Sequence, residues 1–138
     1  MKRVIFLCTG NTCRSQMAEG FLKQYPDFEV FSAGTNPGKI VQPFTVQVMK
    51  ELGINISEQK PESVQKYLKD EFDYVITVCD GAKESCPIFT GKVTNRLHIG
   101  FEDPHGKPIE IFRHVRDEIR QRIKEFAESD KGKDEPIL

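Results

Sequence analysis

Short apolar runs alternate along the chain with segments whose apolar residues recur at helical spacing. The short runs are rich in β-branched and aromatic residues and predict strands at residues 3–7, 28–32, 72–78 and 93–99. The helical spacing predicts helices at residues 15–25, 44–52, 61–68, 80–85 and 109–127. This alternation favours an α/β fold in which a parallel sheet is covered by helices on both faces.

Composition limits what such a fold can do. The chain has 138 residues, so we expect one domain at residues 1–129, followed by a frayed, charged tail at 130–138. The net charge is −1, and Lys and Arg are spread along the chain, so the sequence shows no basic patch that would bind nucleic acid or an anionic membrane. No transmembrane stretch or secretory signal is present, so we expect a cytoplasmic protein. The four cysteines should then be free, metal-binding or redox-active rather than held in static disulfides.

A small polar loop joins the first predicted strand to the first predicted helix. Its residues are Cys8, Thr9, Gly10, Asn11, Thr12, Cys13, Arg14 and Ser15. The backbone N–H groups of such a loop can curl inward, and the helix N-terminus adds partial positive charge. We expect Gly10 to permit a backbone conformation that a side chain would oppose. The loop therefore predicts a site for a small oxyanion.

The side chains of this loop suggest what happens to the oxyanion. Arg14 presents a planar fork that matches two oxygens of a tetrahedral oxyanion. The same positive field favours the thiolate form of Cys8, to which Ser15 can donate a hydrogen bond, while Asn11 can brace the loop. We predict that Cys8 is a thiolate nucleophile.

A structural interpretation of both loop cysteines also exists. Cys8 could be a small apolar residue at the end of a buried strand, where free cysteines often lie. The Gly, Asn and Ser around it favour the catalytic interpretation instead. Cys13 falls in the first helical turn, and there we favour a packed or loop-bracing thiol.

Asp103 is the best candidate for a general acid. A carboxylic acid eases the loss of hydroxide or alkoxide from an oxyanion centre, and Pro104 restricts the backbone of Asp103. The alternative is a common Asp-Pro turn at a helix entrance. Glu102 is expected to be solvated. The histidines lack metal-ligand spacing with the cysteines and are interpreted as surface or packing residues: His98, His105 and His114.

Two further cysteines, Cys79 and Cys86, lie seven residues apart. Cys79 follows the third predicted strand, so the fold class places it at the same sheet edge as Cys8. In a helix, seven residues rise roughly 10 Å, whereas a disulfide needs Cα atoms within about 7 Å. Forming a Cys79–Cys86 disulfide should therefore require the helix to unwind or loop out. Two buried thiols near a sheet edge are the alternative, and a structural zinc site would lack two further ligands.

Several motifs, in order, resemble those of a known family. They are residues 6–20 (FLCTGNTCRSQMAEG), 31–34 (FSAG), the Cys79 to Pro87 segment, 100–104 (GFEDP) and 116–119 (RDEI). The chain resembles the thioredoxin-coupled arsenate reductases of the low-molecular-weight protein tyrosine phosphatase superfamily up to about residue 128. This resemblance implies a three-layer α/β/α domain whose four parallel strands take the flavodoxin-like order 2-1-3-4.

The resemblance also implies roles for individual residues. Cys8 would attack arsenate, for which phosphate and sulfate are mimics, with Arg14 as oxyanion clamp and Asp103 as general acid. Cys79 and Cys86 would form a redox relay that ends in a disulfide reduced by thioredoxin, with glutathione and glutaredoxin as the alternative reductant. We expect a monomer without a tightly bound cofactor. A potassium ion near the loop would use the positions Asn11, Glu19, Ser32 and Glu62, the last in place of an expected aspartate.

Two other functions remain open from the sequence. One is a phosphoprotein phosphatase that uses the same loop, with tyrosine or arginine phosphate as substrate and the later cysteines as a redox guard. The other is a catalytically silent oxyanion or redox sensor. Thr12 resembles the residue of bacterial protein-arginine phosphatases, but Gln16 replaces the Pro usual in the phosphatases. His105-Gly106 replaces the aromatic residues that tyrosine phosphatases carry after Asp-Pro.

Overall fold

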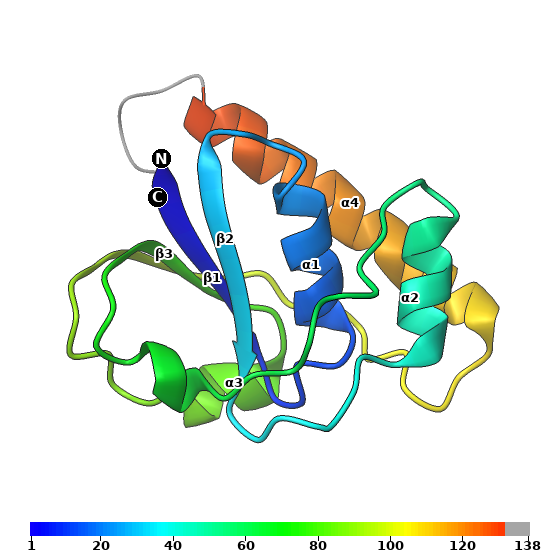
Figure 1. Ribbon diagram of the computed structural model, residues 1–138, viewed down its shortest axis with the longest axis horizontal. Coiled ribbons are helices and arrows are strands. Elements are labelled where there is room, and N and C mark those ends of the chain that lie inside the picture. The colour runs from blue at the N-terminus through cyan, green and yellow to red at the C-terminus, as the bar shows by residue number, and fades with distance from the viewer. Residues whose placement is uncertain (132–138) are drawn as a thin grey trace.

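A computed structural model of the protein describes residues 1–131 as a parallel sheet with helices packed against it (Figure 1). The elements in chain order are β1 (Lys2–Cys8), α1 (Arg14–Leu22), β2 (Phe28–Gly34), α2 (Pro43–Lys50), the 3-10 helix η1 (Val64–Tyr67), β3 (Phe72–Thr77), α3 (Asp80–Ser85), β4 (Val93–His98) and α4 (Ile109–Lys131). The strands pair in parallel in the order β2-β1-β3-β4. The predicted α/β class and strand order are confirmed.

Most observed element bounds lie within three residues of the prediction, and two differences change the picture. The predicted helix at 61–68 is a single 3-10 turn, Val64–Tyr67, which Ser63 caps by accepting a hydrogen bond from the Gln65 backbone N–H. The last helix continues to Lys131, so the first two residues of the predicted tail are helical. The rest of that tail, 132–138, lies outside the described residues.

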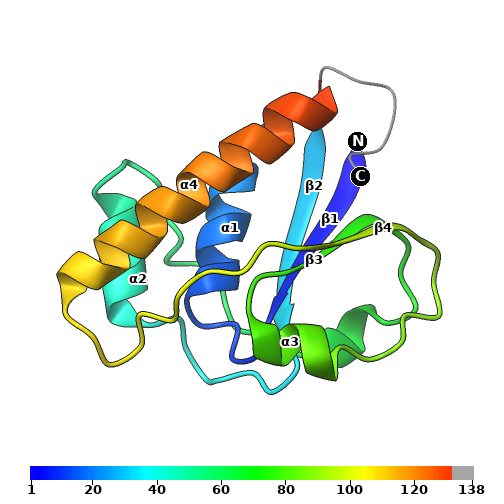
Figure 2. The same ribbon diagram turned by 180° about the vertical axis from the view of Figure 1, so that it is seen from behind.

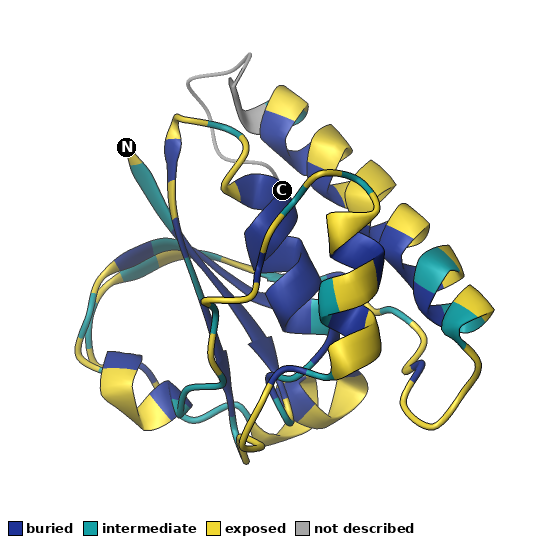
Figure 3. Cartoon of the chain, turned by 45° about the vertical axis from the view of Figure 1, so that its right-hand side comes forward, coloured by how far each residue is buried: buried dark blue, intermediate teal, exposed yellow. Residues whose placement is uncertain are grey.

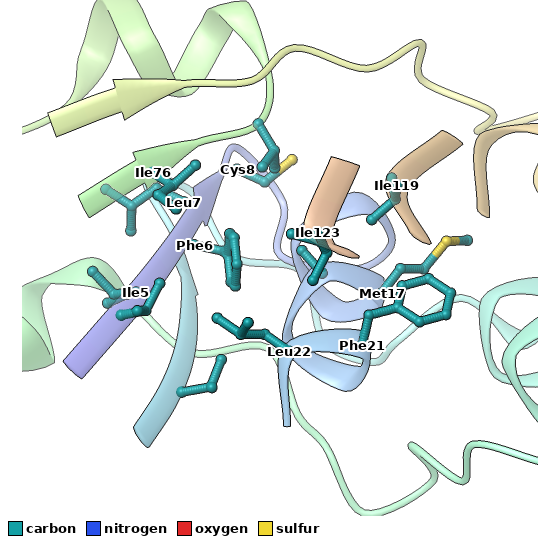
Figure 4. Close-up of a cluster of buried hydrophobic side chains, with 14 of the residues drawn as sticks. Ile5, Phe6, Leu7, Cys8, Met17, Phe21, Leu22, Ile76, Ile119 and Ile123 are labelled. Carbon is teal, nitrogen blue, oxygen red and sulfur yellow. The ribbon is translucent and has the colours of Figure 1, made fainter. Parts of the chain in front are cut away.

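The central strand β1 is buried because helices cover the sheet on both sides of it. Residues 4–8 of β1 are each at most 4% exposed. Figure 4 shows Phe6 on the side of the strand that faces α1 and α4, near Leu22 and Ile123, with Ile5 on the opposite side. The apolar run in β1 is therefore continuous rather than alternating, as expected of a strand buried on both faces.

The two helical layers are unequal. Helices α1, α2 and α4 lie together on one side, where α4 packs against both α1 and α2 (Figure 2). Figure 3 shows that α4 turns a buried stripe inward and an exposed stripe outward. The short α3 packs against β1 and β3 near the carboxyl ends of the strands. Because this layer is thin, the edge of the sheet at the carboxyl ends of the strands lies close to solvent.

Helix α1 is buried on every side, which the amphipathic pattern of Met17, Phe21 and Leu22 did not indicate. Eight of its nine residues are buried, and three of these are polar: Ser15, Gln16 and Glu19. Buried polar side chains must find hydrogen-bond partners, and these three find theirs in and around the loop that follows β1.

Gly34, the last residue of β2, tests how tightly that loop is packed. A Cβ atom at this position would lie 2.5 Å from the Thr9 carbonyl oxygen and 3.1 Å from the Asn11 Cβ. We expect Gly34→Ala to lower the free energy of unfolding by about 2 kcal/mol, because backbone atoms cannot yield as a side chain can. Urea denaturation measures the loss.

Gly10→Ala is the matched control for this measurement. A Cβ atom at Gly10 meets nothing closer than the Thr12 hydroxyl oxygen at 3.4 Å, which is ordinary contact. This variant should keep its unfolding free energy within about 0.5 kcal/mol of the parent. Equal losses in the two variants would contradict the tight-packing argument.

Candidate active site

The loop between β1 and α1 forms the centre of the site. Cys8 ends β1 and is 4% exposed, and α1 begins at Arg14. The residue in the left-handed region is Asn11, with φ of 54°, and not Gly10 as we expected. Asn tolerates this conformation better than other residues with a side chain. Asn11 therefore provides the turn of the loop with its backbone, and its side chain also stabilises the loop.

Asn11 braces the loop, as predicted. Its side-chain N–H₂ donates to the hydroxyl oxygens of Ser15 at 2.7 Å and Ser32 at 2.9 Å. Its side-chain oxygen accepts from the Glu62 backbone N–H at 2.9 Å. One fully buried amide therefore ties α1, β2 and the 57–63 segment to the loop. Because Ser15 acts as acceptor here, its own hydrogen is available, and the predicted bond to the Cys8 sulfur stays a prediction.

Gln16 is a second brace, whose role the sequence did not reveal. Its side-chain N–H₂ donates to the Asn11 carbonyl at 2.9 Å and the Lys60 carbonyl at 3.1 Å. Its side-chain oxygen accepts from the Gln59 amide at 2.8 Å. A proline at this position would remove all three bonds. The only available signal was a buried glutamine where the phosphatases carry proline.

Arg14 lies where an oxyanion clamp should lie. One terminal nitrogen donates to the Phe101 carbonyl at 3.0 Å, and the other is 3.6 Å from an Asp103 carboxylate oxygen. Within residues 1–131, its Nε is buried without a hydrogen-bond partner. A buried donor left unpaired is costly, so the Nε is ready for a ligand acceptor. A cavity of about 410 Å³ opens beside it, lined also by Thr9, Cys79 and Phe101.

Asp103 reaches the same guanidinium from the loop after β4. Its side chain is 55% exposed, and its other carboxylate oxygen accepts from the His105 backbone N–H at 3.0 Å. The bond to His105 fits the Asp-Pro turn, and the contact with Arg14 brings the carboxylate to the site, while the general-acid role stays a prediction. Glu102 is exposed and paired with Lys107 at 2.6 Å, as expected of a solvated side chain.

Cys79 lies beside Cys8, as the shared sheet edge predicted. It caps the N-terminus of α3, where its sulfur accepts from the Ala82 backbone N–H at 3.4 Å. The Thr9 hydroxyl is 3.5 Å from the same sulfur. This approach depends on Gly81, because a Cβ atom there would lie 2.7 Å from the Thr9 hydroxyl oxygen. The helix can therefore place Cys79 against the anion loop.

The two sulfurs share a hydrogen bond that divides their acidities. That bond, with further donors from Thr9 and Ala82, lowers the pKa of Cys79 to about 4. The same bond and burial raise the pKa of Cys8, although Arg14 acts in the opposite direction. Together these effects favour negative charge on Cys79 over negative charge on Cys8 in this conformation. The predicted thiolate nucleophile at Cys8 stays a prediction, because Arg14 favours the thiolate while burial and the neighbouring thiol oppose it.

Cys86 lies at the far end of α3, whose helical segment follows the predicted bounds, 80–85. Its thiol is half-buried and, among the described residues, bonds to the Pro87 carbonyl alone, at 3.5 Å. Burial raises the pKa of Cys86. All four cysteines are free, and the Cys79–Cys86 pair is separated by the whole helix.

Cys13 is packed, as predicted, and burial raises its pKa to about 11.

The four residues expected to hold potassium lie close together, and the two carboxylates among them already form ion pairs. Ser32 donates to Glu19 at 2.6 Å and accepts from Asn11. A second Glu19 oxygen pairs with Lys23, and Glu62 pairs with Lys66 at 2.6 Å. The carboxylates of Glu19 and Glu62 could bind a cation, but each already forms an ion pair with a lysine, Lys23 and Lys66 respectively.

The family assignment follows from the whole chain. The family model described as low molecular weight phosphotyrosine protein phosphatase matches residues 3–135. The chain belongs to this family.

Relatives within the family narrow the comparison. A protein of Brevibacillus brevis (strain 47) named arsenate reductase is 46% identical over 130 residues, covering 93% of this chain and 96% of the relative. A solved arsenate reductase in a phosphate-binding state has a TM-score of 0.83 at 33% identity, covering 94% of this chain and 98% of that one. A low molecular weight protein tyrosine phosphatase of T. tengcongensis has a TM-score of 0.78, also at 33% identity, covering 94% and 99%.

These two structures show how closely the family's reductase and phosphatase branches share one fold. The chain is equally identical to both and has a TM-score of 0.83 with one and 0.78 with the other, so these two comparisons do not by themselves separate the two activities. Among the described residues, no helix has the length and apolar character needed to cross a bilayer.

The sulfur pair generates a direct prediction for this family member. In the parent, iodoacetamide should alkylate Cys79 down to a pH of about 5, because a lowered pKa keeps the thiolate present above about pH 4. In Cys8→Ala the strongest hydrogen bond to Cys79 is lost, so its alkylation profile should shift to higher pH. Peptide mass spectrometry after a short pulse at each pH measures this shift.

Cys86→Ala serves as the control, because it removes a thiol at the other end of α3. Its Cys79 profile should match that of the parent. Superimposable profiles for Cys8→Ala and the parent would show that the Cys8 thiol does not stabilise the Cys79 thiolate.

Proposed function

We propose that the protein reduces arsenate to arsenite. The observation that carries this proposal is the position of Cys79 against the loop that begins at Cys8: the Thr9 hydroxyl lies 3.5 Å from the Cys79 sulfur, and each of the two thiols shifts the pKa of the other. Phosphate-ester hydrolysis requires a nucleophile, an oxyanion clamp and an acid, but no second thiol against the nucleophile. A reductase requires that second thiol, because it must accept the Cys8 sulfur when arsenic departs. The relatives named arsenate reductase support the same activity.

The first step is addition to arsenic. The Cys8 proton passes along the hydrogen bond to Cys79, and the Cys8 thiolate attacks arsenate held by the loop N–H groups and Arg14. A sulfur–arsenic bond forms, and the leaving oxygen departs as water after protonation by Asp103. Phosphate and sulfate have the same tetrahedral shape and should occupy the loop as mimics.

The second step moves two electrons to arsenic. Cys79 gives the proton that it received from Cys8 to solvent, and its thiolate then attacks the Cys8 sulfur and forms the Cys8–Cys79 disulfide. The electron pair of the broken sulfur–arsenic bond stays on arsenic, which leaves as arsenite. Cys86 then attacks Cys79 and releases the Cys8 thiolate. The Cys79–Cys86 disulfide that remains must be reduced by an external dithiol.

Thioredoxin is the electron donor that we propose for this last disulfide, acting in the cytoplasm on a monomeric protein. Support comes from the ends of α3, since the two cysteines can meet only if that helix opens toward solvent. A macromolecular dithiol can reach a disulfide exposed in this way. Glutathione with glutaredoxin is the alternative, and the two donors are compared in the assay below.

The decisive assay follows arsenate-dependent oxidation of NADPH. With thioredoxin and thioredoxin reductase, the parent should turn over many times. Cys86→Ser should produce at most one arsenite per molecule, because Cys8 stays trapped in a disulfide with Cys79. Replacing the thioredoxin system with glutathione and glutaredoxin should give a much lower rate.

Two outcomes would overturn the proposal. Absence of any arsenate-dependent rate in the parent would exclude the reductase, and many turnovers of Cys86→Ser would exclude the relay. The family's phosphatase activity is tested in parallel with a small aryl phosphate. Hydrolysis that persists in Cys86→Ser and far exceeds arsenate reduction in the parent would favour the phosphatase.

In this proposal, a potassium ion would compete with two lysine side chains for the same carboxylates. We infer that the ion binds near Glu19 and Glu62 by displacing Lys23 and Lys66, and therefore weakly in the parent. The double variant Lys23→Met, Lys66→Met leaves both carboxylates without a cation. Potassium chloride should raise its melting temperature by roughly 3 °C over sodium chloride at equal ionic strength.

The parent is the reference for this measurement, and its melting temperature should be nearly the same in the two salts. A potassium-dependent rise of equal size in the parent would show that the lysines do not compete with the ion.

A further inference from the structure

A second cavity lies on the other side of α3 from the anion loop. It measures about 280 Å³ and combines an apolar floor with cationic walls. Its lining residues are Val75, Thr77, Lys83, Cys86, Arg96, Leu97 and His98. The reaction proposed above uses Cys86 but assigns no role to the groups around it.

Arg96 is the cation that faces Cys86 from the sheet. It lies on β4 opposite Val75 of β3, so these two line the same face of the sheet. Arg96 is exposed, and no carboxylate among residues 1–131 forms an ion pair with it. Its positive charge lowers the pKa of Cys86, against the larger effect of burial.

The other charged groups around the cavity are engaged differently. His98 on β4 bonds through one ring nitrogen to the Thr77 hydroxyl at 2.7 Å, and its other ring nitrogen lies 3.2 Å from Asp80. Lys83 on α3 also lines the cavity. Arg96 is the arginine that the sheet contributes to this cavity, opposite Val75 on the same face.

We propose that Arg96 is a positioning residue of the relay, which favours the thiolate form of Cys86 before that sulfur attacks Cys79. This inference rests on the proposed function. A thiol that resolves a disulfide must attack as the thiolate, and Cys86 lies in an apolar cavity that opposes the charged form. Arg96 offsets that opposition without touching arsenate or the Cys8 loop.

The step itself is a thiol–disulfide exchange without net oxidation. The Cys86 thiolate forms a sulfur–sulfur bond to Cys79, the Cys8–Cys79 bond breaks, and Cys8 leaves as the thiolate. The proton that Cys86 gave up goes to solvent. Removing Arg96 lowers the fraction of Cys86 able to attack and leaves the chemistry at arsenic unchanged.

The first test measures the Cys86 thiolate in the intact protein, without arsenate. Iodoacetamide pulses across a pH series are followed by cleavage after Glu84, which separates the Cys79 and Cys86 peptides for mass spectrometry. Arg96→Gln should alkylate at Cys86 about threefold more slowly at neutral pH, with its profile displaced to higher pH. The Cys79 profile should not move.

Two matched variants decide whether charge at this position matters. Lys83→Gln removes the same charge from the same cavity and should leave the Cys86 profile where it is. Arg96→Lys keeps the charge and should restore most of the parental rate. If Arg96→Gln alkylates like the parent, or if Lys83→Gln slows equally, Arg96 has no specific role.

The second test observes the relay directly. With arsenate and no reductant, Arg96→Gln should accumulate the Cys8–Cys79 disulfide and form Cys79–Cys86 more slowly, by about the factor seen in alkylation. The first-step burst of arsenite should be unchanged. Absence of any arsenite from the parent would refute the proposed function, whereas an unchanged alkylation profile would refute the role of Arg96 alone. The two failures are therefore distinguishable.

Discussion

Parallel pairing of β1 with β3 is the constraint on which the site depends. Because parallel strands end at one sheet edge, the register that sets Leu7 beside Thr77 delivers the residues that follow both strands to one place. Cys8 and Cys79 meet there although they are far apart in the sequence. Neither loop could bring the other thiol within reach alone. The chemistry therefore follows from the topology of the sheet.

The anion loop is held by buried polar groups that are nearly all satisfied. Asn11 and Gln16 use their amides to fix the backbone, so that no side chain has to reorganise when an anion arrives. Preorganised donors of this kind supply most of the electrostatic stabilisation in such sites. The buried Nε of Arg14 stands apart from this network. Among the described residues nothing accepts its hydrogen, so it is the donor that an oxyanion bound as proposed would engage.

Much of the fold and the main site residues could be predicted from the sequence, because both are local signals. Apolar runs and helical spacing located the strands and helices, and the loop motif located Cys8 and Arg14. The error at Gly10 arose because composition suggests which residue tolerates a left-handed backbone, whereas packing decides which residue adopts it. At Asn11 the side chain compensates for that conformation with three hydrogen bonds.

The remaining features are non-local and could not be read from spacing. Gln16 contacts a segment more than forty residues away, and Arg96 comes to line the same cavity as Cys86 because β4 pairs with β3. The location of the proton between Cys8 and Cys79 depends on burial and on donors from three segments. A loop motif predicts the sign of the field on Cys8 but not the balance of opposing effects.

The capping of α3 by Cys79 has a consequence for how the reaction could be timed. A helix of six residues with a glycine in its first turn is marginal by itself. Its first turn depends on a negatively charged sulfur as acceptor, and an N-cap contributes about 1 kcal/mol. Once that sulfur enters a disulfide, its charge is gone and the acceptor is weaker. In the proposed relay, the covalent step would therefore weaken the first turn of the helix that the next step must unwind.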